Sequence, residues 1–507
     1  MKNLNSIGKL TAGLVMMSIN SLPAAMGENL QVLPKKGSGQ PNFVFILVDD
    51  MAWYGTAVRM NAELPASGMA FCSMPNVEKL SEQGIVFSHA RAAAAMCGPS
   101  RCSIQTGMTA AHHLYSGNGG FGLKTDGNVK YIAERGQPPL LTPEPQGNIR
   151  FPSIGDVLRS NGYSTAHFGK WHLYGGGPEK HGYDESNGET DNKSVNDVPT
   201  GDKIENPKQI FSITQSGISF MERQQKAGKP FFLQLSHYAT HARYESRPAT
   251  LKKYENNPAF NQITDKRVAK NVIELAAMME DLDTSIGMIM NKIDNLGISS
   301  NTYVVFVSDN GYRSWNQGAE PLRGGKWWIW DGGLRVPMIV RGPGIKPDSR
   351  CDVNVVGYDF LPTIADLAGA SASLPKAVDG VSFKPLLLGQ SVPESYVNRP
   401  IFFHYPHYRE AAPASALVVG QMKMIYFYDH PSQHFQFDLE MDPGEKNNLS
   451  VTYPEKARLM YQQLMDGLKS FGAYFPKPNP TADPNTKIYD PTNLAETTSN
   501  MDDLMSQ

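Results

Sequence analysis

The sequence predicts an α/β fold, with helices on both sides of a large mixed sheet and a smaller α+β subdomain near the C-terminus. Two observations lead to this prediction. Short apolar runs end in polar residues and are separated by helical patterns, which is typical of buried, largely parallel strands. Near the C-terminus, several short strand-like runs follow one another before a single helical stretch, which predicts antiparallel pairing.

In the N-terminal half, predicted strands and helices alternate. Residues 41–48 (PNFVFILV) predict a buried strand that ends at Asp49 and Asp50. The next helix should be capped by Gly84, and a strand after it leads towards residues 97–107. A further helix and strand follow, so that the predicted elements here are residues 76–82, 85–87, 154–161 and 163–168.

The middle of the chain predicts a strand, a long helix and another strand. Residues 231–236 and 303–307 form the strands. Between them, apolar residues from Val268 to Leu296 recur at steps of four and three, and Gly297 closes the stripe as a C-cap. This order implies parallel pairing by a right-handed crossover.

The C-terminal part predicts a separate small subdomain. We expect the large catalytic domain to span residues 40–395 and the subdomain residues 396–475. Residues 476–507 are rich in Pro, Asn, Asp and Thr, and we expect a disordered tail there. The subdomain should contain four short strands and a closing helix, at residues 399–408, 417–419, 422–428, 437–439 and 454–471.

Composition limits the partners and the compartment. The net charge of −2 and the pI near 6.6 give no polyanion-binding surface, so we expect no nucleic-acid partner. Residues 1–27 carry Lys2 and Lys9, a modestly apolar stretch and small residues suited to cleavage, which predicts a signal peptide and a periplasmic or secreted protein. The alternative is an unstructured leader. No other segment approaches the roughly 20 apolar residues of a membrane span.

Four cysteines are too few for a disulfide scaffold. They are Cys72, Cys97, Cys102 and Cys351, and the sequence leaves open which pair, if any, is bridged.

The segment 97–107 (CGPSRCSIQTG) combines a thiol, a hydroxyl and a guanidinium within five residues. Pro99 fixes the turn, and a helix is expected to begin here, where free N–H groups favour negative charge. Cys97 and Arg101 therefore suggest a nucleophile beside an anion anchor. The alternative is an ordinary loop cysteine with a surface arginine.

Two predicted strands end in residues that could bind a metal. Asp49 and Asp50 follow the first strand, and Asp309 and Asn310 follow the strand at 303–307. Carboxylate and amide oxygens suit a hard divalent cation at the carboxyl ends of strands. The alternatives are a helix cap at Asp50 and a plain turn at 308–311.

The spacing C-x-P-S-R-x-x-x-x-T-G resembles the signature of the formylglycine-dependent (type I) sulfatases of the alkaline-phosphatase superfamily. The resemblance implies an alkaline-phosphatase-like fold. It also implies that a maturation enzyme oxidises Cys97 to formylglycine (3-oxoalanine). A hydrated aldehyde attacks through one hydroxyl and keeps a second to expel sulfate, whereas a serine would remain as a stable sulfate ester.

Other motifs extend this resemblance over about residues 41–449. It implies that Asp49, Asp50, Asp309, Asn310 and modified Cys97 bind Ca²⁺, and that Arg101, Lys170 and Lys326 neutralise the sulfate. His172 would deprotonate the hydrate, and His241 with Lys326 would protonate the leaving alcohol. Lys170 and His172 lie in the segment GKWHL, where an extended chain would point both side chains to one side.

Three residues differ from the family pattern. Thr240 replaces a Pro before His241, Trp327 replaces a Gly after Lys326, and Asp331 replaces a Glu. We expect Trp327 to line the substrate pocket and Trp330 to pack in the core, the alternative being that all these rings are structural. His237 is expected to support the site or to pack.

The resemblance implies a sulfuric ester hydrolase. Export and the long polar loop at 175–208, which we expect near the substrate, favour a sulfated poly- or oligosaccharide and thus polysaccharide degradation. The alternatives are a general arylsulfatase on aryl sulfates, a phosphonate or phosphate monoester hydrolase, and a non-catalytic glycan-binding protein on a sulfatase scaffold.

Overall fold

The computed structural model describes residues 39–117, 130–133, 138–144, 148–192, 204–312, 321–408, 411–486 and 490–491. The signal peptide expected at residues 1–27 lies outside this part and stays a prediction. Among the helices within these ranges, none has the length and apolar character needed to cross a membrane. Ser38–Gln507 forms one compact unit.

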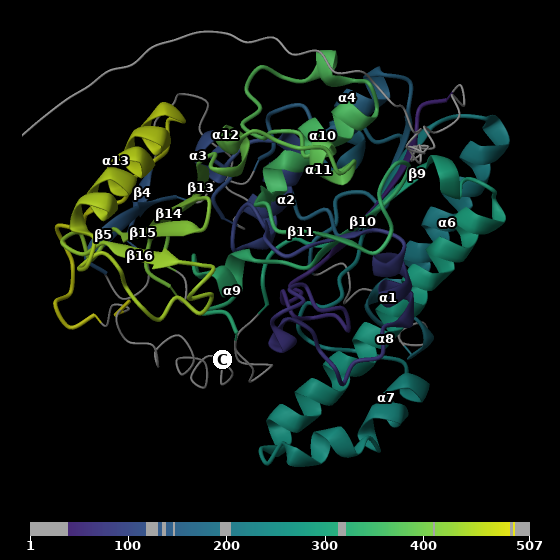
Figure 1. Cartoon of the computed structure of the whole chain (residues 1–507), viewed down its shortest axis with the longest axis horizontal. Coiled ribbons are helices and arrows are strands. Elements are labelled where there is room, and N and C mark those ends of the chain that lie inside the picture. The colour runs from purple at the N-terminus through teal and green to yellow at the C-terminus, as the bar shows by residue number, and fades with distance from the viewer. Residues whose placement is uncertain are drawn as a thin grey trace, which may run out of the picture. The chain divides into compact units, whose positions relative to one another are not determined.

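An eight-stranded mixed sheet forms the centre of the described chain (Figure 1). Only β10 runs antiparallel to its neighbours, and the other pairs are parallel. The order across the sheet is β11 (Ser349–Cys351), β2 (Ile85–Phe87), β10 (Met338–Arg341), β9 (Thr302–Ser308), β1 (Asn42–Val48), β8 (Phe231–Ser236), β6 (Ser164–Gly169) and β7 (Glu185–Ser186). The predicted large mixed sheet is confirmed.

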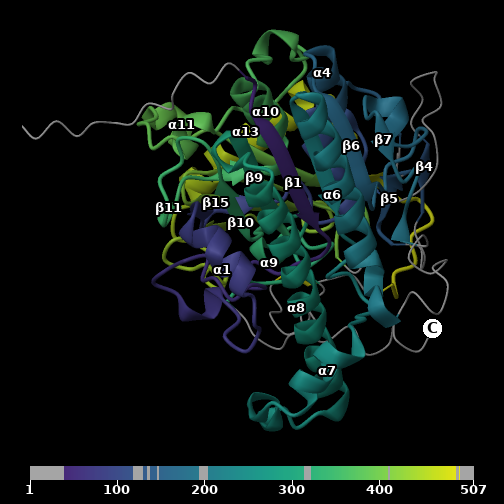
Figure 2. The same cartoon turned by 90° about the vertical axis from the view of Figure 1, so that its right-hand side faces the viewer.

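Helices cover both faces of this sheet. Val44 and Ile46 of β1 join a cluster with α1 (Pro75–Glu82), α6 (Ile210–Ala227) and α8 (Lys266–Asn295), and Figure 2 shows α6 and α8 in front of β1. Phe43 and Phe45 point to the opposite face, under α2 (Cys97–Thr106), α4 (Ile154–Ser160) and α10 (Phe360–Leu367). Because both faces are buried, the strands read as continuous apolar runs rather than as alternating patterns.

The C-terminal sheet is an antiparallel meander, as predicted. It consists of β13 (Ile401–Tyr405), β14 (Ala414–Val419), β15 (Met422–Phe427) and β16 (Phe435–Asp438). One face packs on α13 (Pro454–Ser470), and the other packs on the segment around Trp330.

Three features differ from the sequence predictions. The helix α6 was not predicted, and Thr214 and Gly217 interrupt its otherwise apolar buried stripe. Gly217 lets α6 approach β8 closely, since a Cβ there would lie 2.8 Å from Leu235. Helix α7 (Pro248–Glu255) was also missed, and the loop predicted at residues 175–208 contains the edge strand β7.

The start of the expected disordered tail is ordered. In the described part, β17 (Lys477–Pro478) pairs with β5 (Leu140–Pro143), which also pairs with β4 (Tyr131–Ile132). Most of the tail beyond residue 486 lies outside the described residues. The remaining short elements are β3 (Ala90–Arg91), β12 (Val355–Val356), α3 (Ala110–His113), α9 (Asp331–Leu334), α11 (Lys384–Leu387) and α12 (Glu394–Val397).

Candidate active site

The carboxyl ends of four adjacent parallel strands carry most of the predicted site residues. The strands are neighbours in the order β9, β1, β8, β6, and ligand sites of open α/β sheets lie at this edge. The residues that follow these strands are Asp309 and Asn310 after β9, Asp49 and Asp50 after β1, His241 after β8, and Lys170 after β6.

Cys97 stands at the N-terminal end of α2 and is fully buried in this cluster. Its Sγ lies 3.3 Å from Asp49 Oδ1, 3.6 Å from Asp50 Oδ1, 3.5 Å from Lys170 Nζ and 3.1 Å from Lys326 Nζ. Burial and the Asp49 carboxylate raise the pKa of the Cys97 thiol well above its usual value. The unmodified thiol is therefore protonated at neutral pH and is a weak nucleophile.

The backbone conformation at Asp50 explains how the carboxylates of two consecutive residues point into the same cluster. In an extended strand, neighbouring side chains point to opposite sides. Asp50 instead has a φ of 59°, and its N–H donates to Asp309 Oδ1 at 3.1 Å. The backbone thus turns at Asp50, two residues after the end of β1. Ligand atoms of Asp49, Asp50, Cys97 and Asp309 all lie within 4.8 Å of one another.

The donor atoms in this cluster fit a hard divalent cation. Asn310 Nδ2 donates to Asp50 Oδ1 at 2.8 Å, whereas Asn310 Oδ1 is buried and has no hydrogen-bond partner among the described residues. Three carboxylates and a free amide oxygen match the ligands that Ca²⁺ prefers. The residues predicted as metal ligands are therefore brought together.

Three cations balance the three carboxylates. Lys170 Nζ lies 2.5 Å from Asp49, Lys326 Nζ 2.7 Å from Asp50, and Arg101 Nε 2.8 Å from Asp309, and all six side chains are at most 3% exposed. Burial alone would raise the pKa of Asp49, but Lys170, His241 and Arg101 hold it well below its usual value. For Asp309, burial prevails over Arg101 and raises the pKa to about 7.

The two histidines are influenced most by different members of the cluster. His172 has a φ of 54°, so the chain is not extended through Lys170 and His172 as expected, yet His172 is buried near Lys170 and Arg101. Burial and these cations hold its pKa well below the usual value, which leaves a neutral imidazole. His241 Nε2 lies 3.6 Å from Asp50 Oδ2, and burial with the nearby Lys326 lowers the pKa of His241 to about 4.

The departures from the family pattern have structural explanations. Thr240 donates both its N–H (2.7 Å) and its hydroxyl (3.1 Å) to the carbonyl of Asp49, which ties the His241 loop to the end of β1. A proline could not donate an N–H. His237 is buried, and its backbone N–H donates to the carbonyl of Leu47 at 2.9 Å, so its position beside the end of β1 is fixed while its role stays a prediction.

Trp327 does not line an open pocket in the structure. It is 4% exposed and clusters with Met96 and Tyr405. The structure thus favours the packing alternative for this residue. Trp330 is fully buried against Phe427 and Phe437, as expected.

Sequence reasoning missed three charged residues near His241. Lys208, Arg243 and Glu245 line a pocket next to it. The only signal in the sequence was that Lys208 ends the long loop predicted to face the substrate.

All four cysteines are free.

Comparisons with known proteins identify the family. The family model described as Sulfatase matches residues 41–370, and that described as "N-sulphoglucosamine sulphohydrolase, C-terminal" matches residues 325–471. The chain is 27% identical to the N-acetylgalactosamine-6-sulfatase of Canis lupus familiaris, over 82% of this chain and 77% of that protein. It is 25% identical to an ulvan-active sulfatase of Formosa agariphila, over 81% of this chain and 77% of that protein.

A solved structure shows the same fold. It is Ps i-CgsB in complex with k-i-k-neocarrahexaose, with a TM-score of 0.66 and 21% identity, covering 92% of this chain and 100% of that chain. Because the family model matches well over half of the sequence, the chain belongs to the sulfatase family and is a sulfuric ester hydrolase.

Proposed function

We propose that the protein releases inorganic sulfate from a sulfated carbohydrate, with a nucleophile formed from Cys97. The observation that carries this proposal is the convergence of two lysines and two carboxylates on one buried Sγ, at distances of 3.1 to 3.6 Å. Oxidation of Cys97 to formylglycine would supply a hydrated aldehyde whose second hydroxyl lets sulfate leave. The names of the relatives, a galactosamine-6-sulfatase and an ulvan-active sulfatase, favour a glycan substrate.

The charge balance of the cluster supports an anionic ester as ligand. Three buried cations offset three buried carboxylates, so a divalent cation held by Asp49, Asp50, Asp309 and Asn310 leaves two positive charges in excess. Buried charge without a partner is costly, and a sulfate ester, which carries one negative charge, would offset half of this excess. Arg101, Lys170 and Lys326 are then placed to hold sulfate oxygens as charge builds on them.

The histidines supply the proton transfers in this proposal. His172 is neutral at neutral pH and can accept a proton from the nucleophile. His241 has a pKa of about 4 without ligand, and an anionic group beside it would raise that pKa and favour the protonated form. Lys326, for which Asp50 outweighs burial and raises the pKa, remains charged and can share the role of acid.

The test is sulfate release from a panel of defined sulfated oligosaccharides, with an aryl sulfate and the phosphate ester of the same phenol as comparisons. We expect turnover of at least one oligosaccharide and a strong preference for sulfate over phosphate esters. The Cys97→Ala variant is the matched control for contaminating activity. Faster turnover of the phosphate ester would point to a phosphate or phosphonate hydrolase, and turnover of the aryl sulfate alone to a general arylsulfatase.

A further inference from the structure

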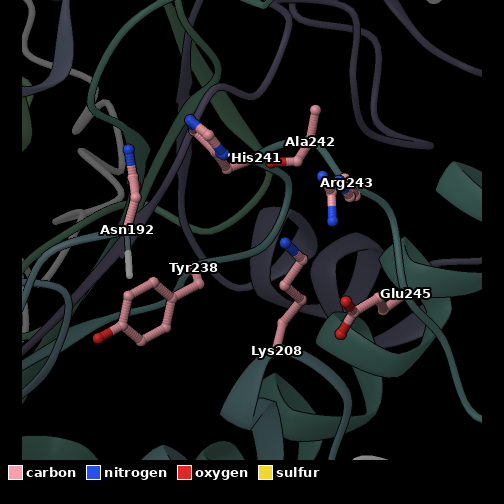
Figure 3. A pocket seen from close by; sticks show the side chains of 7 residues that line it. All are labelled: Asn192, Lys208, Tyr238, His241, Ala242, Arg243 and Glu245. Carbon is pink, nitrogen blue, oxygen red and sulfur yellow. Dashed lines mark hydrogen bonds between the residues drawn. The ribbon is translucent and has the colours of Figure 1, made fainter. Parts of the chain in front are cut away.

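A pocket of about 250 Å³ opens beside His241, and Figure 3 shows its lining from close by. Among the described residues, the charged side chains on its wall are Lys208, Arg243 and Glu245, together with His241 and the ring of Tyr238. His241 reaches the catalytic cluster, since its Nε2 lies 3.6 Å from Asp50 Oδ2. The pocket therefore adjoins the residue that we expect to protonate the leaving alcohol.

Lys208 has a mostly buried side chain whose ammonium opens onto the pocket. Its side chain points into the pocket in Figure 3, the residue is 7% exposed, and within the described ranges its Nζ makes no hydrogen bond or ion pair. Burial lowers its pKa, which the nearby Glu245 opposes. A cation on the wall of a pocket, with a buried stem and no protein partner, is available to an anionic ligand.

The backbone holds Lys208 in an unusual conformation. Lys208 and Gln209 have φ values of 53° and 55°, directly before α6. Two consecutive non-glycine residues in the left-handed region are disfavoured by roughly 1–3 kcal/mol each, and such residues cluster where a ligand is held.

Arg243 and Glu245 provide complementary groups across the pocket. Arg243 is exposed and Glu245 is half-buried, and neither makes a hydrogen bond or ion pair with another described residue. The two cations outnumber the one carboxylate. An arginine fork suits the planar oxygens of a carboxylate or sulfate, and a glutamate accepts hydrogen bonds from sugar hydroxyls.

From this arrangement we infer that the pocket, here called the Lys208 pocket, holds the sugar ring that carries the scissile sulfate. Lys208 and Arg243 bind a second anionic group on that sugar or on its neighbour, a carboxylate or a second sulfate, while Glu245 accepts hydrogen bonds from hydroxyls. This inference rests on the proposed function, because the Lys208 pocket lies on the leaving-group side of the catalytic cluster. A volume of about 250 Å³ is smaller than the roughly 300–1,000 Å³ of sites for larger ligands, which suits one sugar unit.

The test compares three disaccharides that share one scissile sulfate. The first has no other charge, the second carries an additional sulfate, and the third carries a uronic acid carboxylate. We expect the wild-type protein to prefer one charged disaccharide over the neutral one by at least tenfold in kcat/KM. A hydrogen bond to a charged group contributes about 1.4 kcal/mol or more, which corresponds to a factor of ten. Which of the two is preferred identifies the second anionic group.

The variants assign the preference to the pocket. Lys208→Met should remove most of the tenfold preference, mainly through KM, and Arg243→Gln should reduce it by about threefold. The matched control is Lys226→Met, an exposed lysine on α6. Because Arg243 is exposed, its variant should fold even if the Lys208 variant does not, which melting curves would reveal.

Three results would overturn the inference. The first is a wild-type protein that releases sulfate from all three disaccharides without preference. The second is a preference that survives in Arg243→Gln and in folded Lys208→Met. The third is a loss in Lys208→Met that is equal on all three disaccharides and on an aryl sulfate. If the wild-type protein releases sulfate from none of the disaccharides and from no aryl sulfate, the proposed function fails first, and the inference falls with it.

Discussion

Asp331 should be the most stability-sensitive charge outside the catalytic cluster. Its carboxylate forms ion pairs with Arg91 and Arg335 at 2.9 Å and with Lys423 at 3.0 Å. Lys423 also forms an ion pair with Glu445 at 2.8 Å. The side chains of Asp331, Arg91 and Lys423 have no solvent exposure, and the network joins β15 of the C-terminal sheet to the segment that carries Lys326. Three cations against two carboxylates leave it with one excess positive charge.

Asp331→Asn would leave three cations against one carboxylate, so the excess positive charge rises to two. Removing one partner of a buried ionic network costs about 3–5 kcal/mol. Lys423→Met instead leaves two cations against two carboxylates. Glu445, whose pKa burial already raises, can also take up a proton when Lys423 is lost, so we expect less than about 2 kcal/mol for this variant.

Thermal melting of the purified variants measures the difference. With an unfolding entropy of about 2.1 cal/mol/K per residue, each kcal/mol corresponds to about 1 °C in a unit of this size, so Asp331→Asn should lower Tm by about 3–5 °C. Asp466→Asn, at an exposed position of α13, is the matched control. Equal losses for Asp331→Asn and Lys423→Met, or a larger loss for the lysine variant, would show that charge counting does not describe this network.

Three further predictions concern the site and the pH range. Peptide mass spectrometry of active protein should show loss of sulfur at Cys97 with Cys102 intact; an active sample that keeps the Cys97 thiol would contradict the formylglycine proposal. Asp309→Ala should abolish activity while the protein stays folded, because it removes one of three carboxylates from the cation site; full activity after exhaustive chelation would argue against a metal there. Burial lowers the pKa of His113 and His167 to about 3. Below about pH 6.5 the unfolded chain therefore binds more protons than the folded protein. The free energy of unfolding should fall by about 1.4 kcal/mol for each of these two histidines and each pH unit as the pH drops below about 6.5. An unchanged Tm between pH 7.5 and 5 would contradict this assignment.

Local patterns predicted much of the central sheet, because buried strands leave strong signals. The strands predicted at 85–87 and 231–236 have the observed bounds, and those at 41–48 and 303–307 are displaced by one residue at one or both ends. Helix α8 was predicted because its apolar stripe is long and regular. Helix α6 was not, since Thr214 and Gly217 interrupt its buried apolar stripe, Gly217 at the point where α6 approaches β8 closely.

The site was predicted where a short motif fixes the chemistry. Asp49, Asp50, Asp309 and Asn310 lie at neighbouring strand ends, so correct strand predictions nearly sufficed to bring them together. Trp327 shows the limit of this reasoning. A tryptophan beside a catalytic lysine can face the ligand or the core, and its contacts with Met96 and Tyr405, distant in sequence, decide for the core.

Lys208 marks the point at which sequence patterns stop being informative about the substrate. A lysine at the end of a polar loop is normally a solvated charge, and nothing in residues 204–208 distinguishes it from its neighbours. Its burial arises from the packing of α6 and of the segment that follows β8, which supplies Tyr238, Arg243 and Glu245 to the same pocket. Catalytic residues of this family can be found from the motif alone because every member must handle the same sulfate. The residues that bind the sugar need only suit one substrate, so they must be found from geometry. The ammonium of Lys208, which opens onto a pocket beside His241, is the strongest such indication in the described chain.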